Sequence, residues 1–82
     1  MKDFIEYLVK KIATKPKKVK VEETEDNGML IYKVTADEED MGIVIGKEGK
    51  NIRALRNLAK AKAIKDNIHI KIFVEDTYQN ND

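Results

Sequence analysis

An Asn-Gly pair, Asn27-Gly28, constrains the fold of this chain more than any other feature, because it lies between two runs rich in β-branched and aromatic residues. A two-residue type I′ turn needs positive φ at both positions, which Asn and Gly adopt readily. Such a turn also fixes the register of the strands around it, so that Glu25 faces Leu30. The pair therefore predicts an antiparallel hairpin. One face of this hairpin carries the residues that we assign to the core, Val19, Val21, Leu30, Tyr32 and Val34.

The spacing of apolar residues predicts one helix before the hairpin and two helices after it. The first helix begins at an Asp3 N-cap and ends before Pro16, whose ring cannot continue a helix. A short helix over residues 38–44 starts at an Asp37 cap, and a longer one covers residues 50–65. The residues predicted to be buried on the first and last helices are Phe4, Ile5, Leu8, Val9, Ile12, Ile52, Leu55, Ala59 and Ala63.

A third strand is predicted over residues 68–75, where apolar side chains recur at every second position. A helical crossover separates it from the second hairpin strand, so the two strands should pair in parallel. We therefore expect an α+β fold in the order α-β-β-α-α-β, with a three-stranded mixed sheet and helices packed on one face. We also expect one domain over residues 1–76 and a frayed tail over residues 77–82, which has nothing to bury.

Two glycines, Gly46 and Gly49, interrupt the chain between the two later helices, in the stretch "VIGKEGKNI". Their spacing fits neither a Walker phosphate loop nor a dinucleotide-binding fingerprint, which leaves a G-x-x-G turn between helices. Because they lack a Cβ, both glycines allow a tight turn and the close approach of a sugar-phosphate chain. Their amides are expected to hold phosphates, together with Lys47, Lys50 and the N-terminus of the following helix.

Residues beside this turn supply the other features of a single-stranded nucleic-acid groove. Ile43, Ile45 and Ile52 are expected to form an apolar floor for the bases. Arg53 should contact the backbone or a base edge. Residues 41–65 carry seven basic side chains against one carboxylate, although the net charge of the whole chain is only +1. The alternative is a plain helix–turn–helix corner, in which one glycine serves as a C-cap.

Several chemistries lack the residues that they require. The chain has no Cys and no Ser, which excludes a disulfide framework, a thiolate metal site and both of those nucleophiles. His69 is the single histidine and has no Cys, Asp or second His at the spacing of metal ligands. The acidic run over residues 37–40 is better explained as a helix start than as a metal cluster. The charged N-terminal segment is typical neither of a signal peptide nor of a membrane span. We therefore expect a protein that is not an enzyme and has no metal or cofactor.

The stretch "GIVIGKEGKNIRAL" resembles the signature of the KH domain, an aliphatic-Ile-Gly-x-x-Gly-x-x-Ile pattern. The matching positions are Ile45, Gly46, Lys47, Glu48, Gly49 and Ile52. The element order resembles the type II arrangement, in which a helix and a strand precede a minimal β-α-α-β core, here residues 29–75. A stand-alone domain of this length is similar to the small bacterial KH proteins of the KhpA (YlqC) family.

This resemblance implies a cytoplasmic bacterial protein that binds single-stranded RNA of broad sequence range through its G-x-x-G loop, with single-stranded DNA as an alternative ligand. It also implies a post-transcriptional regulator or RNA chaperone that affects cell-envelope growth and cell shape. Pairing with itself or with a larger KH-containing protein is implied as well, whereas a membrane or a small-molecule substrate is not. The predicted RNA-binding residues are Ile43, Ile45, Gly46, Lys47, Glu48, Gly49, Lys50, Asn51, Ile52 and Arg53.

Two features predict that RNA binding is weak and undiscriminating. Glu48 places a carboxylate inside the phosphate-gripping loop and partly offsets the charge of Lys47. The connection over residues 65–67 is short, so the groove should be open on that side. The chain also has no Trp, and neither Phe4 nor Phe73 is placed to stack on a base, so specificity should be modest.

A protein-interaction module is the rival interpretation, in which RNA binding is secondary. A core of this size gains from a partner, and exposed apolar residues could supply the interface. These residues are Ile31, Leu58, Ile64 and Phe73. The two interpretations are compatible, because a single KH unit grips only about four nucleotides and a second copy would extend the site.

Overall fold

The computed structural model describes residues 1–75, so the tail predicted over residues 77–82 lies outside the described residues. The main elements are α1 (Lys2–Ile12), β1 (Lys20–Asp26), β2 (Met29–Thr35), α2 (Met41–Ile45), α3 (Lys50–Asp66) and β3 (His69–Val74). Short 3-10 segments cover Pro16–Lys18, Glu38–Asp40 and Lys47–Gly49. The predicted order of elements is confirmed. No helix within residues 1–75 has both the length and the apolar content that crossing a membrane requires.

The sheet has the predicted mixed topology, because its central strand β2 is antiparallel to β1 and parallel to β3. At the hairpin turn, Asn27 and Gly28 have φ angles of 53° and 84°, both positive as a type I′ turn requires. The predicted register is confirmed, with Glu25 opposite Leu30. Within the sheet β3 pairs with β2 alone, so its other edge faces away from the sheet.

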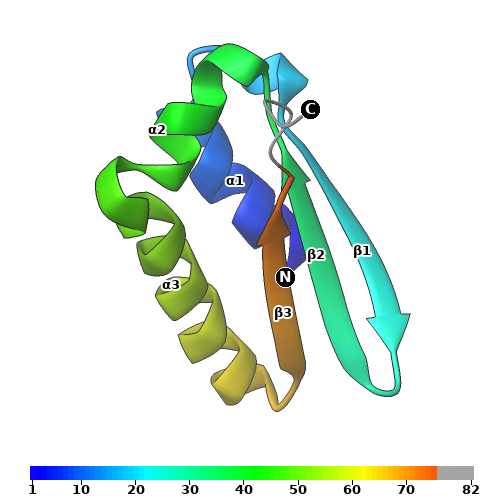
Figure 1. The fold of residues 1–82 in the computed structure, drawn as a ribbon. Helices are drawn as coiled ribbons and strands as arrows, with labels where there is room; N and C mark the ends of the chain where they lie inside the picture. The colour runs from blue at the N-terminus through cyan, green and yellow to red at the C-terminus, as the bar shows by residue number, and fades with distance from the viewer. Residues whose placement is uncertain (76–82) are drawn as a thin grey trace, which may run out of the picture.

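The helices cover one face of the sheet, and the core lies between the two layers (Figure 1). Tyr32, at the centre of β2, is 1% exposed and belongs to a core cluster to which every main element contributes. The predicted buried stripe of α3 is confirmed, since Ile52, Leu55, Ala59 and Ala63 are all buried. The core cluster consists of Ile5, Val9, Val19, Val21, Tyr32, Val34, Ala36, Met41, Val44, Ile52, Leu55, Ala59 and Ile72.

The N-terminal helix differs from the prediction at both ends. It begins at Lys2, and the Ile5 amide donates to the Met1 carbonyl oxygen at 3.0 Å, so Asp3 lies in the first turn and is not the N-cap. Lys2 joins the helix, with Met1 as the N-cap. The Asp3 carboxylate lies in the first turn, where it interacts favourably with the positive end of the helix dipole. At the other end Ile12, which was predicted to be buried, is 41% exposed as the last residue of α1.

Asp40 ties the segment after α1 to the start of α2. Its carboxylate is fully buried and accepts hydrogen bonds from the Thr14 hydroxyl at 2.7 Å, the Thr14 amide at 3.0 Å and the Lys15 amide at 2.9 Å. The Thr14 hydroxyl, reinforced by the two amides, holds the pKa of Asp40 below its ordinary value of 3.8, although burial acts in the opposite direction. The predicted Asp37 cap is confirmed as well, since its carboxylate accepts from the Glu39 amide at 2.9 Å. These contacts fix where α2 begins and hence where the glycine loop lies.

Candidate nucleic-acid interface

The loop over residues 46–49, here called the glycine loop, joins α2 to α3 with an unusual backbone. Gly46, Glu48 and Gly49 have φ angles of 79°, 58° and 75°, all in the region that favours glycine. For Glu48, which has a side chain, this conformation costs about 1 kcal/mol. The loop thus turns the chain sharply within a few residues, and α3 starts directly after it (Figure 1).

The two glycines of the loop are required for different reasons. A Cβ on Gly46 would lie 2.7 Å from the Asn51 backbone nitrogen and 2.8 Å from its Cγ, so both space and φ demand glycine there. A Cβ on Gly49 would find only ordinary contacts, the nearest being Arg53 Nη1 at 3.7 Å. At Gly49 only the backbone angle favours glycine.

The amides of the glycine loop divide into bonded and unbonded pairs. Gly46 N–H donates to the Gly42 carbonyl at 2.8 Å, and Gly49 N–H donates to the Gly46 carbonyl at 3.0 Å. Both glycine amides, which we expected to hold phosphates, are therefore bonded within the chain. Within residues 1–75, the amides of Lys47 and Glu48 donate to no protein acceptor. These two amides are the ones that remain for an anion.

A row of five basic side chains leads away from the glycine loop along α3. This basic stripe consists of Lys47, Lys50, Arg53, Arg56 and Lys60, all of them exposed. The members on α3 recur at spacings of three and four residues, which keeps them on one side of the helix. Within residues 1–75 none of the five forms an ion pair with a carboxylate. Their charge is therefore available to a polyanion.

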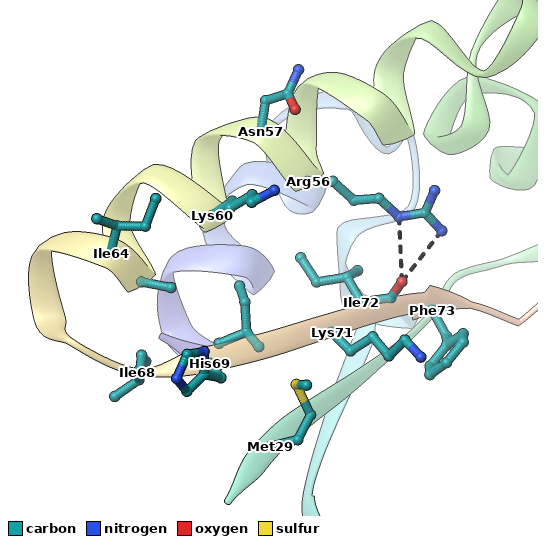
Figure 2. A pocket seen from close by; sticks show the side chains of 12 residues that line it. Met29, Arg56, Asn57, Lys60, Ile64, Ile68, His69, Lys71, Ile72 and Phe73 are labelled. Carbon is teal, nitrogen blue, oxygen red and sulfur yellow. Dashed lines mark hydrogen bonds between the residues drawn. The ribbon is translucent and has the colours of Figure 1, made fainter.

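An open groove of about 570 Å³ lies between α3 and the outer edge of β3 (Figure 2). Along α3, the end of the groove nearer the glycine loop carries the polar side chains of Arg56, Asn57 and Lys60. The opposite end, around Ile64, is apolar. The full lining is Met29, Arg56, Asn57, Lys60, Ala63, Ile64, Ile68, His69, Ile70, Lys71, Ile72 and Phe73. Charged groups thus border an apolar surface of the kind on which unstacked bases can rest.

Arg56 bridges the groove at its end nearest the glycine loop. Its Nε and Nη2 atoms both lie 3.3 Å from the Ile72 carbonyl oxygen, as the dashed lines in Figure 2 show. This carbonyl lies on the edge of β3 that has no neighbouring strand in the described part of the chain, where an unpaired acceptor needs a partner. Arg56 remains exposed, and its guanidinium bends over the strand edge.

The predicted apolar floor lies elsewhere in the molecule. Ile52 is 7% exposed and belongs to the core, Ile45 is half-buried against the core, and Ile43 is 41% exposed. None of these three lines the groove beside β3. The groove residues on α3 and β3 were not among the predicted binding residues. The available signal was the basic spacing on α3 together with the parallel, edge position of β3, which brings the two elements side by side.

A smaller, apolar hollow of about 180 Å³ lies on another side of α3, toward α1. Leu58 stands at this hollow with 52% of its surface exposed. Its lining is Leu8, Val9, Ile12, Val44, Asn51, Ala54, Leu55 and Leu58. The predicted interface residues are thus dispersed, because Ile64 and Phe73 line the groove beside β3.

The fold and the loop together define a class of protein. Along the chain, two helices joined by a G-x-x-G loop connect the parallel strands β2 and β3, and α1 and β1 precede this unit. This order is the type II arrangement of the KH domain. A family model described as "KhpA/KhpB, KH domain" matches residues 2–74. The chain belongs to this family of KH-domain proteins.

Individual relatives agree with the family model. "RNA-binding protein KhpA" of Chlamydia trachomatis is 38% identical over 72 residues, which cover 88% of this chain and 92% of the relative. The protein of the same name from Clostridium perfringens is 40% identical over 67 residues, covering 82% of this chain and 89% of the relative. That from Thermotoga maritima is 38% identical over 61 residues, covering 74% and 81%. No solved structure matches the chain.

Proposed function

We propose that this protein binds single-stranded RNA, with the phosphates at the glycine loop and the bases along the groove beside β3. The observation that carries this proposal concerns the amides of Lys47 and Glu48, which have no hydrogen-bond acceptor within residues 1–75. They lie next to the side chains of Lys47 and Lys50, which form no ion pair with a carboxylate of the same described residues. Backbone amides and ammonium groups are common ligands of phosphate oxygens. The relatives from Chlamydia trachomatis and Clostridium perfringens, each named "RNA-binding protein KhpA", point the same way.

The groove accounts for a single-stranded ligand of modest specificity. About four nucleotides fit a single KH unit, and their bases would lie against the apolar end around Ile64. The connection between α3 and β3 covers only residues 67–68, so no long loop walls this end. An open groove without Trp offers few base-specific contacts, which suits the broad target range of a post-transcriptional regulator or RNA chaperone in the bacterial cytoplasm.

The test is a fluorescence-anisotropy titration of short single-stranded RNAs at several salt concentrations. With about three phosphates held, log K should fall against log salt with a slope near roughly −2. In Lys47→Gln/Lys50→Gln, we expect weaker binding and a slope nearer to zero by roughly 1 to 2, because each lysine lost releases one counterion fewer. Single-stranded DNA of the same sequence tests the alternative ligand.

The matched control is Lys17→Gln/Lys18→Gln, which removes the same charge from the turn before β1. Both control lysines are exposed and lie outside the groove and the glycine loop. Equal loss of affinity in the two double variants would mean a diffuse charge effect and would contradict the assignment. Failure of the wild type to bind any single-stranded RNA or DNA would contradict the proposed function as a whole. Circular dichroism of each variant shows whether it is folded.

A second candidate function, self-association or pairing with a larger KH-containing protein, is favoured by the apolar hollow between α1 and α3. Leu58 and Ile12 are both partly exposed there, and apolar residues clustered around a hollow are typical of contact surfaces. We expect Leu58→Lys to yield a monomer in sedimentation equilibrium, because a charge would be buried in the interface. Ile64→Lys, an equally apolar but more exposed position at the groove, should leave assembly unchanged. A monomeric wild type would contradict self-association through this surface.

A further inference from the structure

Asn51 lies in the first turn of α3, and its side chain crosses the glycine loop to reach α2. Its Nδ2 atom donates a hydrogen bond of 2.6 Å to the Ile43 carbonyl oxygen. We propose that Asn51 is a positioning residue that keeps the Lys47 amide available for a phosphate. This assignment rests on the proposed function only for its RNA consequence, since its effect on the loop concerns the free protein.

The role follows from which donor the Ile43 carbonyl would otherwise have. In a helix each carbonyl accepts from the amide four residues later, and α2 keeps this pattern as far as Gly46, whose amide donates to Gly42. The next amide in the same pattern is that of Lys47, and its acceptor would be Ile43. Asn51 occupies that acceptor where α2 ends, and within residues 1–75 the Lys47 amide has no protein acceptor.

Gly46 leaves the space that the Asn51 contact requires. The backbone nitrogen, Cγ and Cβ of Asn51 lie 2.7, 2.8 and 2.9 Å from the place where a Cβ on residue 46 would stand. Asn51 reaches Ile43 only because residue 46 has no side chain. The first glycine of the motif and Asn51 therefore act as a pair, in which the glycine makes room and the asparagine fills the helix end.

Removal of the Asn51 donor should therefore change the free loop. In Asn51→Ala the Ile43 carbonyl loses this partner, and the Lys47 amide is the donor that the helical pattern would supply to it. We expect slower hydrogen exchange at the Lys47 amide, measured by NMR in the absence of RNA, because the amide becomes hydrogen-bonded. Asn51→Asp has nearly the same shape but no donor, and it should show the same change. If both do so, the cause is the lost donor and not the lost volume.

Asn57→Ala is the matched control for the hydrogen-exchange rate and for stability, because it makes the same substitution at an exposed position of the same helix. Both alanine variants gain helix propensity, so neither should unfold the protein. The Lys47 exchange rate should stay at its wild-type value in Asn57→Ala. An unchanged Lys47 rate in Asn51→Ala would overturn the proposal, whatever happens to RNA binding.

The RNA readout separates this role from that of a charged contact. Asn51→Ala should bind RNA roughly tenfold more weakly, the effect of one lost hydrogen bond to a phosphate. Its salt slope should equal that of the wild type, because no cationic group is lost. If Lys47 exchange slows while RNA affinity stays unchanged, the amide does not serve the ligand and this part of the proposal fails. If the wild type binds no RNA, the proposed function fails, and the exchange experiment still decides the role of Asn51 in the loop.

Discussion

Arg56 on α3 and Ile72 on β3 are joined by a forked contact, in which two guanidinium nitrogens lie 3.3 Å from one carbonyl oxygen. The contact is made across the groove and not within the core. It therefore links the helix to the strand edge at one end of the groove. The side chain that makes this link has a planar fork with no equivalent in lysine.

A charge-conserving substitution tests the importance of this fork. Arg56→Lys keeps the positive charge but offers only a single, flexible donor group. We expect its Tm to fall by roughly 5 °C, the effect of one weakened hydrogen bond in a domain of this size. RNA affinity should fall as well, with an unchanged salt slope. Thermal melts and anisotropy titrations measure the two effects.

Arg53→Lys is the control for Arg56→Lys. Arg53 belongs to the same basic stripe and is equally exposed, but within residues 1–75 its side chain makes no hydrogen bond. Its replacement should leave Tm near the wild-type value. Equal shifts in Tm for the two variants would contradict a special role for the Arg56–Ile72 contact.

Three glycine substitutions should rank in a fixed order of stability. Gly46→Ala should destabilise by about 3 kcal/mol, because the left-handed backbone and the contact with Asn51 both oppose a Cβ. Gly49→Ala should cost about 1 kcal/mol, since only the backbone angle opposes it. Gly42→Ala should stabilise by up to about 1 kcal/mol, because that residue is helical and a Cβ there meets open space. Urea denaturation gives the three values, and a larger loss for Gly49→Ala than for Gly46→Ala would contradict the loop geometry.

Glu48 should limit RNA affinity and can be replaced without harm to the loop. Asn adopts the left-handed backbone of this position more readily than Glu, so Glu48→Asn should fold at least as stably. Removal of one carboxylate from the proposed phosphate site should strengthen RNA binding about three- to fivefold at low salt, and high salt should abolish the difference. Glu25→Gln makes the same change of charge at the hairpin and should have little effect. Equal gains for the two variants would show that Glu48 acts only through the net charge.

Local patterns in the sequence were sufficient for the elements of this fold. The Asn27-Gly28 turn fixes strand register by its backbone angles, and the buried stripe of α3 follows from helical spacing alone. Both signals involve residues close together in the chain. The fold class could therefore be predicted before any tertiary contact was known.

The groove and its contacts could not be predicted in this way, because they join residues far apart in the sequence. Arg56 borders the buried stripe of α3, and only the position of β3 decides whether it faces solvent or the strand edge. The partners of Asp40 lie 25 and 26 residues before it. A short-range pattern assigned that carboxylate to an exposed helix start, whereas three donors from another segment bury it completely.

The Asp40–Thr14 contact predicts how stability depends on pH. Because the pKa of Asp40 in the folded protein lies below its ordinary value of 3.8, the unfolded chain binds the proton more readily than the folded chain does. The stabilisation is fully present above about pH 4 and is lost as pH falls through the folded pKa. Melting curves between pH 7 and pH 2 should therefore show Tm falling below about pH 4.

Two substitutions attribute part of this fall to Asp40. Asp40→Asn places an amide group where the carboxylate accepts three donors, so at least one donor loses its acceptor. We expect its Tm at neutral pH to be lower by roughly 10 °C and its decline with acid to be shallower than that of the wild type. Thr14→Val removes only the hydroxyl donor and should give an intermediate Tm. If Asp40→Asn melts like the wild type across this range, the three hydrogen bonds do not stabilise the start of α2.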